Sequence, residues 1–423
     1  DRSPSRGLGD VYKRQMQQIG DGEWTVYQTE TLNADNNWTF TWKNLPEKQN
    51  GENVFYSVEE ASHTPEEYIY IHKDMSKDAD AVTYTFTNVA PTEFTVEKKW
   101  VGMETEPEQG ITVGLYRTTE EGNIGSTEGT PVPINETDNA SPRTATLNAE
   151  NEWTAEFTGL PKYNEDGDLY HYYALEMSGR EPVAQQGSLN HAGQDYAVDY
   201  DHEDGTTIRN IPTTAITGTK TWVDNGNAYN TRPKAGDFQL TLWRTTDGEI
   251  WAEISDLAAA GITFTWDTGE EGSNTWTYHF DNLPLYTPEG GEYTYRVTEA
   301  TSPNGYAEQN DGAGVSEDNN DATNGPAFTN TLTGTIEVKG TKTWEGTPSE
   351  TPPTLILERQ LGADSTWETV NAEVTWTIPE NGEEASNEWT YTFGDLPLYN
   401  DNGVRYTYRV TEADQDDYDV YYT

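Results

Sequence analysis

The chain contains no cysteine, so it can form neither disulfide bonds nor thiolate metal sites. It also lacks any uninterrupted apolar run long enough to span a membrane as a helix. Basic residues are scarce, with 25 Lys and Arg against 74 Asp and Glu. The formal net charge of -49 would repel nucleic-acid phosphates and anionic lipid surfaces. We therefore expect no nucleic-acid partner and no membrane contact in this fragment.

Patterns that bind metals are missing as well. The 6 histidines are scattered without an HExxH motif, and the acidic segments 199–205 and 316–325 lack the spacing of an EF-hand loop. Carboxylate pairs of the glycosidase type are expected by chance among 74 acidic residues. We expect a solvated acidic surface, no cofactor and no metal, and no enzyme that acts on an external substrate.

What the chain does contain indicates β-structure. Hydrophobic residues make up only 33%, yet aromatic residues reach 12%, which favours packed cores over disorder. Segments such as 276–280 and 293–297 alternate aromatic and polar residues with a period of two, and clusters of Gly, Asn, Asp and Pro separate them. No window keeps a helical period. The sequence therefore predicts an all-β chain of antiparallel sandwiches.

Residues 1–15 have the opposite charge balance from the rest of the chain. Within them, residues 10–15 (DVYKRQ) look like an in-frame translation of a transposon end used in sequencing libraries. We predict that residues 1–15 are a cloning or sequencing artefact. The alternative is a short, basic, disordered tail.

One sequence word occurs four times: Trp, three residues, an aromatic residue, two residues, then Leu-Pro. After each copy, an aromatic strand ends in a glutamate. A Lys-x-Trp word begins three repeats, and a strand with an asparagine closes three. The predicted domains are residues 16–91 (domain 1, without its first strand), 92–213 (domain 2, complete), 214–333 (domain 3, complete) and 334–423 (domain 4, without its last strand).

The repeated lysine, glutamate and asparagine share strand parity with apolar neighbours, so all three are predicted to point inward. The lysines are Lys98, Lys220 and Lys342; the glutamates are Glu60, Glu176, Glu299 and Glu412; the asparagines are Asn88, Asn210 and Asn330. Burial favours a neutral amine and a protonated acid. The amine can then attack the carboxamide while the acid shuttles protons, leaving a Lys-Asn isopeptide bond and ammonia. A buried salt bridge without covalent chemistry is the alternative.

These words, with Arg232-Pro233, Leu242-Trp-Arg244 and Phe-Thr-Asn-Thr, resemble the Cna B-type (collagen-adhesin B-region) repeats over residues 16–423. The resemblance implies prealbumin-like, reversed immunoglobulin-type β-sandwiches in tandem. It also implies isopeptide bonds Lys98–Asn210 and Lys220–Asn330, with Glu176 and Glu299 as catalytic residues. In the incomplete repeats, Glu60 and Glu412 would accompany Asn88 and Lys342, which we expect to remain unpaired.

The resemblance implies a stalk segment of a Gram-positive surface adhesin or pilin, extracellular and anchored to the cell wall through a missing C-terminal region. A host or matrix ligand would bind regions outside this fragment. The alternative function is a ligand-binding adhesin or carbohydrate-binding module. Domain 2 departs from the pattern, since it has Ala174 in place of valine, lacks Arg-Pro, and ends in Ile208-Arg-Asn210.

Overall fold

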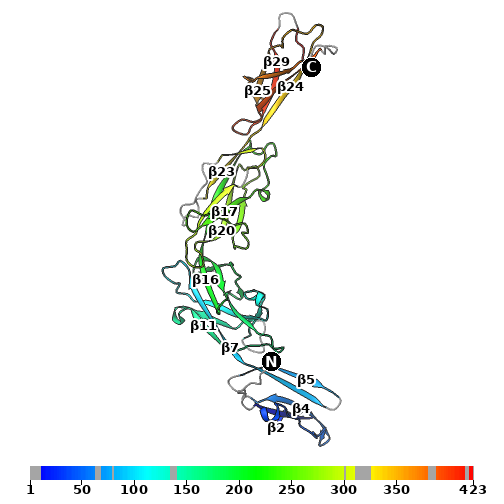
Figure 1. Cartoon of the computed structure of the whole chain (residues 1–423), viewed down its shortest axis with the longest axis vertical. Helices are drawn as coiled ribbons and strands as arrows, with labels where there is room; N and C mark the ends of the chain where they lie inside the picture. The colour runs from blue at the N-terminus through cyan, green and yellow to red at the C-terminus, as the bar shows by residue number, and fades with distance from the viewer. Residues whose placement is uncertain are drawn as a thin grey trace. The chain divides into compact units, whose positions relative to one another are not determined.

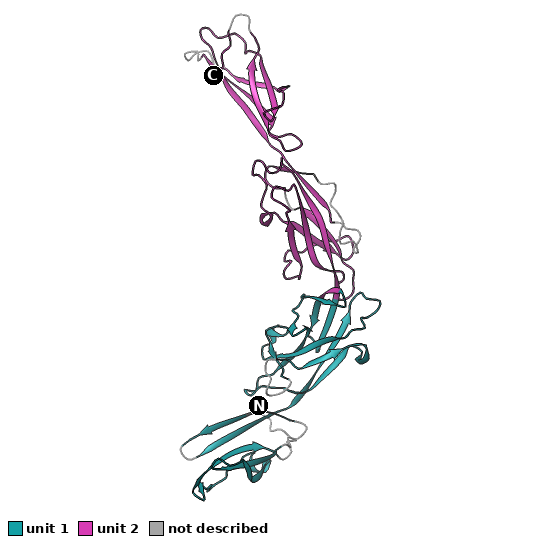
Figure 2. Cartoon of the chain, turned by 180° about the vertical axis from the view of Figure 1, so that it is seen from behind, with its two compact units in different colours: residues 1–193, 198–210 teal, residues 194–197, 211–423 magenta. Residues whose placement is uncertain are grey.

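The computed structural model describes residues 11–61, 68–78, 81–133, 141–299, 302–309, 325–379, 387–414 and 419–422. These residues form strands and short 3-10 turns without an α-helix, which confirms the predicted all-β class (Figure 1). None of their segments forms a helix that is long and apolar enough to cross a membrane. The chain divides into two compact units, residues 1–193 with 198–210, and residues 194–197 with 211–423 (Figure 2).

Domain 3 consists of two sheets, with strand orders β18-β17-β21 and β19-β20-β16-β23-β22. The strand that carries the lysine, β16, lies in the middle of the second sheet, antiparallel to β20 and parallel to β23. The first and last strands of the domain are therefore neighbours. The elements are β16 (Thr206–Val223), η4 (Ala235–Asp237), β17 (Leu240–Thr245), β18 (Ala252–Glu253), β19 (Thr263–Asp267), β20 (Thr275–Pro284), β21 (Thr294–Glu299), β22 (Tyr306–Gln309) and β23 (Ala327–Leu332).

Domain 2 has the same plan. Its sheets have the orders β10-β8-β12-β13, with β9 beside β8, and β11-β7-β16-β15-β14. The first part of β16 is the last strand of domain 2 in sequence, and in this second sheet it lies between β7 and β15, parallel to β7. The elements are β7 (Pro91–Trp100), β8 (Ile111–Thr118), η2 (Glu121–Asn123), β9 (Thr130–Pro131), β10 (Thr144–Leu147), η3 (Ala149–Asn151), β11 (Thr154–Pro161), β12 (His171–Ser178), β13 (Glu181–Pro182), β14 (Ser188–His191) and β15 (Gln194–Asp201).

Domain 4 contains the sheets β24-β28-β27 and β26-β25-β29, with the lysine strand β24 at an edge. Its strands are β24 (Thr335–Thr343), β25 (Leu355–Leu361), β26 (Glu368–Val370), β27 (Val374–Thr377), β28 (Glu388–Pro397) and β29 (Tyr406–Glu412). Domain 1 contains the sheets β2-β1-β4-β3 and β5-β6. Its elements are β1 (Val11–Ile19), β2 (Thr25–Leu32), η1 (Ala34–Asn36), β3 (Lys48–Gln49), β4 (Glu52–Glu60), β5 (Ile69–Lys77) and β6 (Val82–Val89).

The Trp-x3-aromatic-x2-Leu-Pro word lies at the centre of each complete core. In domain 3 it forms β20, where Trp276, Phe280 and Leu283 are buried. Phe280 and Leu283 would face opposite sides of a regular strand because they are three residues apart. Both point inward because the pairing with β16 shifts register between them, and Asn282 takes a left-handed φ of 63°. The spacing of the word therefore matches a β-bulge that turns both apolar side chains into the core.

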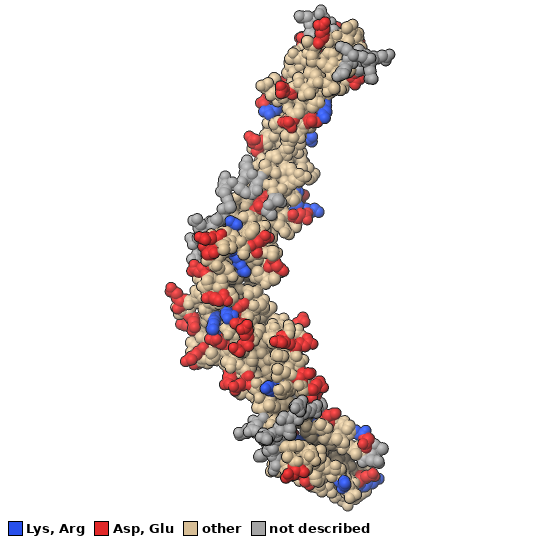
Figure 3. Space-filling model, in the orientation of Figure 1, with Lys and Arg blue, Asp and Glu red and all other residues tan. Residues whose placement is uncertain are grey.

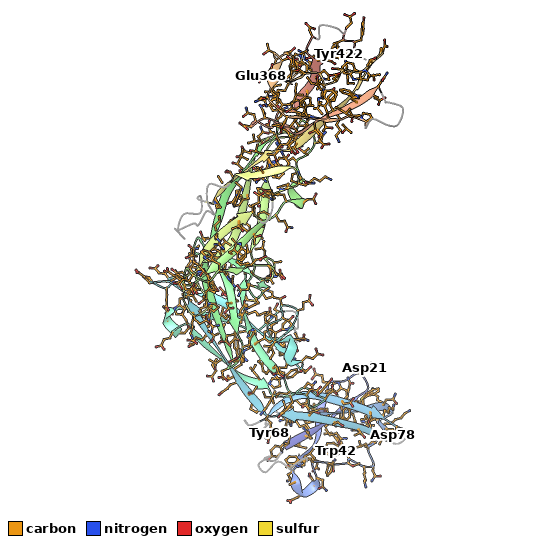
Figure 4. The ribbon with its side chains drawn as sticks, turned by 45° about the horizontal axis from the view of Figure 1, so that its top comes forward. Asp21, Trp42, Tyr68, Asp78, Glu368 and Tyr422 are labelled. Carbon is orange, nitrogen blue, oxygen red and sulfur yellow. The ribbon has the colours of Figure 1, made fainter. Side chains whose placement is uncertain are left out.

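In domain 1, no described strand pairs with this word. Residues 38–46, which include Trp42 (labelled in Figure 4), form no strand among the described residues, and Trp38 is less buried than its counterparts in the other domains. In the other domains the lysine strand pairs with this segment.

One expectation needs correction: residues 11–15 belong to β1, so a disordered tail does not describe them, although their origin as an artefact stays a prediction.

Acidic side chains are scattered over the visible face of the molecule and do not gather into one patch (Figure 3). This distribution agrees with the solvated acidic surface expected from the composition.

Candidate crosslinking site

Domain 3 brings Lys220, Glu299 and Asn330 together inside its sandwich. Lys220 Nζ lies 2.5 Å from Glu299 Oε2, and Asn330 Nδ2 donates to Glu299 Oε1 at 2.6 Å. Lys220 and Asn330 are 0% exposed, and the side chain of Glu299 is also 0% exposed. One carboxylate thus holds the amine with one oxygen and the carboxamide with the other. The predicted inward orientation of all three side chains is confirmed.

Domain 2 repeats this arrangement with Lys98, Glu176 and Asn210. Lys98 Nζ lies 3.0 Å from Glu176 Oε2, and Asn210 Nδ2 donates to Glu176 Oε1 at 3.1 Å. All three residues are buried. The sequence departures of domain 2 therefore leave the geometry of the site intact.

The strand register explains why the two sites match. In the parallel first and last strands, Trp222 is opposite Asn330 in domain 3, and Trp100 is opposite Asn210 in domain 2. The asparagine thus aligns with the tryptophan two residues after the lysine in both domains. The glutamate comes from the other sheet, where Glu299 pairs with Leu240 and Glu176 pairs with Val113. The site spans the interior of the sandwich.

Burial weakens the charged form of the lysine. Desolvation lowers the pKa of Lys98 to about 8, although the Glu176 carboxylate acts in the opposite direction. Aromatic rings line this environment, with Lys98 Nζ 4.6 Å from the ring centre of Trp100 and Lys220 Nζ 5.0 Å from that of Trp222. The carboxamide oxygens of Asn210 and Asn330 are buried and have no hydrogen-bond partner among the described residues. Buried polar atoms in native structures nearly always have a hydrogen-bond partner, so these two carboxamide oxygens are exceptions that need an explanation.

Four tyrosines support the glutamate strands in a way that sequence reasoning missed. Each tyrosine lies four residues before the glutamate and donates its hydroxyl to the proline carbonyl of the Leu-Pro word. The bonds are Tyr56 to Pro46 (3.0 Å), Tyr172 to Pro161 (2.6 Å), Tyr295 to Pro284 (2.6 Å) and Tyr408 to Pro397 (2.5 Å). The repeated tyrosine and proline were visible in the sequence, but their contact depends on how the sheets face each other.

Domain 2 holds its site with two further contacts. The hydroxyl of Tyr200 accepts the backbone N–H of Glu176 at 3.1 Å and donates to the carbonyl of Val183 at 2.8 Å. Arg209, the neighbour of Asn210 on β16, donates to Asp199 at 3.1 Å and to Asp201 at 3.0 Å. The strand that carries the asparagine is thus tied to β15.

Domain 3 uses a different cluster, at the end of the lysine strand. Asp224 is fully buried and accepts two bonds from Arg232, at 2.9 Å from Nε and 2.6 Å from Nη2. The hydroxyl of Tyr306 donates to the same carboxylate at 3.0 Å, and its ring packs on Trp222. Burial alone would raise the pKa of Asp224, but the hydrogen bonds from Arg232 and its neighbours lower the pKa overall.

The incomplete domains contain parts of the same site. In domain 4, Lys342 Nζ lies 2.8 Å from Glu412 Oε2, and Glu412 Oε1 has no hydrogen-bond partner among the described residues. In domain 1, Asn88 Nδ2 donates to Glu60 Oε1 at 3.2 Å. Glu60 is the inward residue, as strand parity predicted. The side chain of its neighbour Glu59 is exposed and lies 3.9 Å from Arg14.

A lysine that the sequence analysis had set aside also reaches Glu60. Lys13 Nζ lies 2.5 Å from Glu60 Oε2. Desolvation lowers the pKa of Lys13, although the Glu60 carboxylate acts in the opposite direction. Lys13 and Asn88 thus both contact Glu60, and the expectation that Asn88 forms no crosslink stays a prediction. Lys13 is not the equivalent of Lys98, because β1 pairs with β4 as β8 pairs with β12. Its inward parity with Val11 and Gln15 was the available signal.

Three further features bear on metal or ligand binding: possible metal-ligand groups, the two acidic segments and a hollow in domain 2. The described residues contain no group of three or more His, Asp or Glu placed to hold a metal ion. Asp199, in one of the acidic segments, accepts hydrogen bonds from Gln185, Gln186 and Arg209. Most of the other segment, 316–324, lies outside the described residues. A hollow of about 430 Å³ in domain 2 has Tyr170 as its aromatic lining, and the Arg117 guanidinium lies 4.4 Å from that ring centre.

Comparison with known proteins finds several similar chains. The chain is 27% identical over 400 residues to the collagen adhesin of Staphylococcus aureus, and it spans 27% of the length of that relative. It is similar to two B repeat units of the collagen-binding protein of Staphylococcus aureus, at 22% identity, covering 96% of this chain and 88% of that one, with a TM-score of 0.19. It is also similar to a pilus adhesin from Lactobacillus rhamnosus GG, at 14% identity, covering 97% and 50%, with a TM-score of 0.26.

A family model, the Cna protein B-type domain, matches residues 14–89, 94–211, 216–331 and 338–423. These four matches cover most of the chain, and each corresponds to one of the repeats found in the sequence. The chain therefore belongs to the Cna protein B-type domain family, as a tandem array of its β-sandwiches.

Proposed function

We propose that this chain is a stalk segment of a bacterial surface adhesin or pilin-like protein, stabilised by the isopeptide bonds Lys98–Asn210 and Lys220–Asn330. The observation that carries the proposal is the buried Lys-Glu-Asn geometry, which is the same in domains 2 and 3. A buried salt bridge alone would not require an asparagine on the second carboxylate oxygen. The repeated presence of the carboxamide favours the covalent reaction.

The reaction follows from the groups present in domain 3. A proton passes from Lys220 to Glu299, leaving a free amine and a neutral carboxyl group. Rotation of the Asn330 carboxamide brings its unbonded oxygen to that carboxyl group. Lysine Nζ attacks Cγ, the Nζ–Cγ bond forms, and the Cγ–Nδ2 bond breaks. Nδ2 leaves as ammonia after it receives a proton through Glu299. Fixed contact inside the core supplies the high effective concentration that this slow reaction needs.

The proposed bonds would join the first and last strands of each complete domain. Those strands are parallel neighbours, so tension would enter and leave a domain through the crosslink without loading the rest of the sandwich. Without the bond, unfolding of about 110 residues would release on the order of 350 Å of chain, at about 3.3 Å per residue. The bond would therefore keep the segment at constant length under load.

The strand β16 belongs to both domain 2 and domain 3, so it connects the two proposed crosslinks. It carries both Asn210 of the first crosslink and Lys220 of the second within a single strand, Thr206–Val223. The connection between the two crosslinks is therefore ordered strand. This continuity supports a load-bearing role.

The stalk role also defines what the segment does not do. We propose no external substrate, since each site would react once and release ammonia. A matrix ligand and the cell-wall anchor would belong to regions outside this chain, in an extracellular protein. The name of the Staphylococcus aureus relative, a collagen adhesin, motivates this assignment. The domain 2 hollow does not favour the alternative of a carbohydrate-binding module, because the Arg117 guanidinium lies over the ring of Tyr170, its aromatic lining.

Intact mass under denaturing conditions tests the proposal. Two bonds lower the mass by two ammonia molecules, and an unreduced mass would refute the crosslinks. Peptide mapping would assign the linked pairs.

A cleavage experiment tests the load path. We would place a protease site in the exposed turn at Glu289 and Gly290, between Lys220 and Asn330. The cut chain should remain one species on a denaturing gel, whereas the same chain with Asn330→Ala should separate into two. As a matched control, a site at Thr333 and Gly334 lies outside both crosslinked loops, and cutting there should separate the fragments in every variant. Separation after the first cut would contradict the bond.

A further inference from the structure

Tyr278 on β20 packs directly over the lysine strand of domain 3. It pairs with Gly218, two residues before Lys220, and it is 0% exposed. A Cβ atom at Gly218 would lie 2.2 Å from the Tyr278 hydroxyl oxygen. Any larger residue at this position would therefore displace the ring. The glycine of the Gly-x-Lys-x-Trp sequence thus makes room for this tyrosine.

The hydroxyl of Tyr278 reaches the entrance of the strand that carries the asparagine. It donates to the carbonyl of Pro326 at 2.8 Å, and β23 begins at the next residue. The backbone N–H of Gly325 also donates to Thr217 on β16 at 2.9 Å. A Cβ atom at Gly325 would lie 2.7 Å from the tyrosine oxygen. The hydroxyl therefore joins β20, β16 and the first residue before β23 at one point.

This contact lies where the register of β23 is decided. Asn330 reaches Glu299 only when Trp222 is opposite Asn330 on the parallel strand β16. A slip by one residue would turn the asparagine to the other face of the sheet, away from the glutamate. The carbonyl of Pro326 precedes Asn330 by four residues, so fixing it fixes the face on which Asn330 lies.

Among the domains, the residue at the position of Tyr278 varies with the length of the connection that precedes the last strand. In domain 2, residues 202–205 join β15 to its paired neighbour β16, and Ala155 occupies the tyrosine position opposite Val96. In domain 1, residues 78–81 join β5 to β6, and the sequence word has Phe40 at this position. Both last strands follow tight connections, which limit register by themselves.

In domain 3 the connection from β22 to β23 comprises residues 310–326, and a longer connection restricts the following strand less. Tyr278 occurs in this domain. Domain 4 repeats the pair as Tyr391 and Gly340, where a Cβ atom at the glycine would lie 2.3 Å from the hydroxyl. The tyrosine and the glycine therefore occur together.

We propose that Tyr278 is a positioning residue for the Lys220–Asn330 crosslink, whose hydroxyl sets the register of β23 through Pro326. This proposal rests on the proposed function, because it concerns the same site. Tyr278 touches none of the reacting atoms in the described contacts. Its effect would be on the fraction of domain 3 in which Asn330 faces Glu299.

The test is Tyr278→Phe, which keeps the ring over Gly218 and removes only the hydroxyl. The full chain is made by cell-free synthesis and sampled into denaturant over time. The linked peptides of domains 2 and 3 are then quantified by mass spectrometry. Pulse proteolysis of the same samples gives the folded fraction. We expect the rate of Lys220–Asn330 formation per folded domain to fall roughly fivefold, the factor for one hydrogen bond of about 1 kcal/mol. The Lys98–Asn210 rate should not change.

A second arm reads the register without the reaction. In a Lys220→Ala background, Tyr278→Phe should increase hydrogen exchange at the amides of β23 and leave those of β17 unchanged. An unchanged rate of crosslinking would overturn the proposal. A slower rate explained entirely by a smaller folded fraction would also overturn it, since the hydroxyl would then serve stability alone. If the parent chain yields no linked domain 3 peptide, the proposed function fails, while the exchange arm still tests the register role.

Discussion

In domain 2 the hydroxyl of Tyr200 fixes the backbone of Glu176, and Arg209 ties the asparagine strand to β15. In domain 3 the lysine strand is fixed instead, by the buried Asp224–Arg232 pair beyond Trp222 and by Tyr278 across Gly218. The glutamate contacts and the strand register are nevertheless the same. The comparison shows that the Lys-Glu-Asn arrangement depends on a defined relation of three strands, and that different neighbours can maintain this relation in the two domains.

The largest expected effect comes from removing the acceptor in each domain. Asn210→Ala and Asn330→Ala keep the Lys-Glu pair but remove the carboxamide, so each variant should lie one ammonia below its own sequence mass, whereas the parent should lie two below. Each closed loop contains about 110 residues, so each domain should lose about 5 kcal/mol of unfolding free energy. Intact mass and calorimetry measure both effects. A clearly unequal loss would show that the two sites do not contribute alike.

The supporting clusters should differ in their contribution to stability. Arg232→Ala leaves the buried Asp224 carboxylate without a positively charged partner, which should cost domain 3 about 3–5 kcal/mol. Arg209→Ala should cost domain 2 less, about 1–2 kcal/mol, because Asp199 keeps its bonds from two glutamines and Asp201 is exposed. Denaturant unfolding of each variant measures the difference. Lys99→Ala, which breaks an exposed pair with Glu97, serves as the control and should have almost no effect.

Tyr200→Phe should affect domain 2 alone. The change leaves the backbone N–H of Glu176 and the carbonyl of Val183 without their partner inside the core. We expect a loss of about 1–3 kcal/mol and slower formation of the Lys98–Asn210 bond. Time-resolved peptide mapping would show it, with the domain 3 peptide as the internal reference. Equal slowing in both domains would contradict a local role for this hydroxyl.

The smallest expected effect is a pH dependence in the chain that cannot crosslink domain 2. In Asn210→Ala, the pKa of Lys98 is lowered by burial to about 8, against 10.5 for the unfolded chain. The unfolded state therefore binds more protons between these values, and stability should rise as the pH increases above about 8. Thermal melting between pH 7.5 and 9.5 measures the slope. Lys98→Met in the same background should abolish this contribution, and an unchanged slope would exclude Lys98 as its source.

The sequence predicted the residues of the site because its signals are local. Parity along one strand was enough to place Lys220, Glu299 and Asn330 inside, and the spacing of the repeats was enough to assign one of each to domain 3. The same reasoning chose Glu60 over Glu59. It did not predict that Lys13 contacts Glu60, because Lys13 lies on a different strand from the one that carries Lys98 in domain 2.

The sequence by itself thus determined the all-β class, the repeat boundaries as a prediction, and the three side chains on the inner faces, since alternation depends only on neighbours along the chain. The tertiary structure decided which of these side chains share a carboxylate, because that depends on parallel pairing between strands far apart in sequence. It also decided that Tyr278 needs Gly218 opposite it and that Tyr295 reaches Pro284. Such contacts follow from how two sheets face each other, which no local pattern encodes.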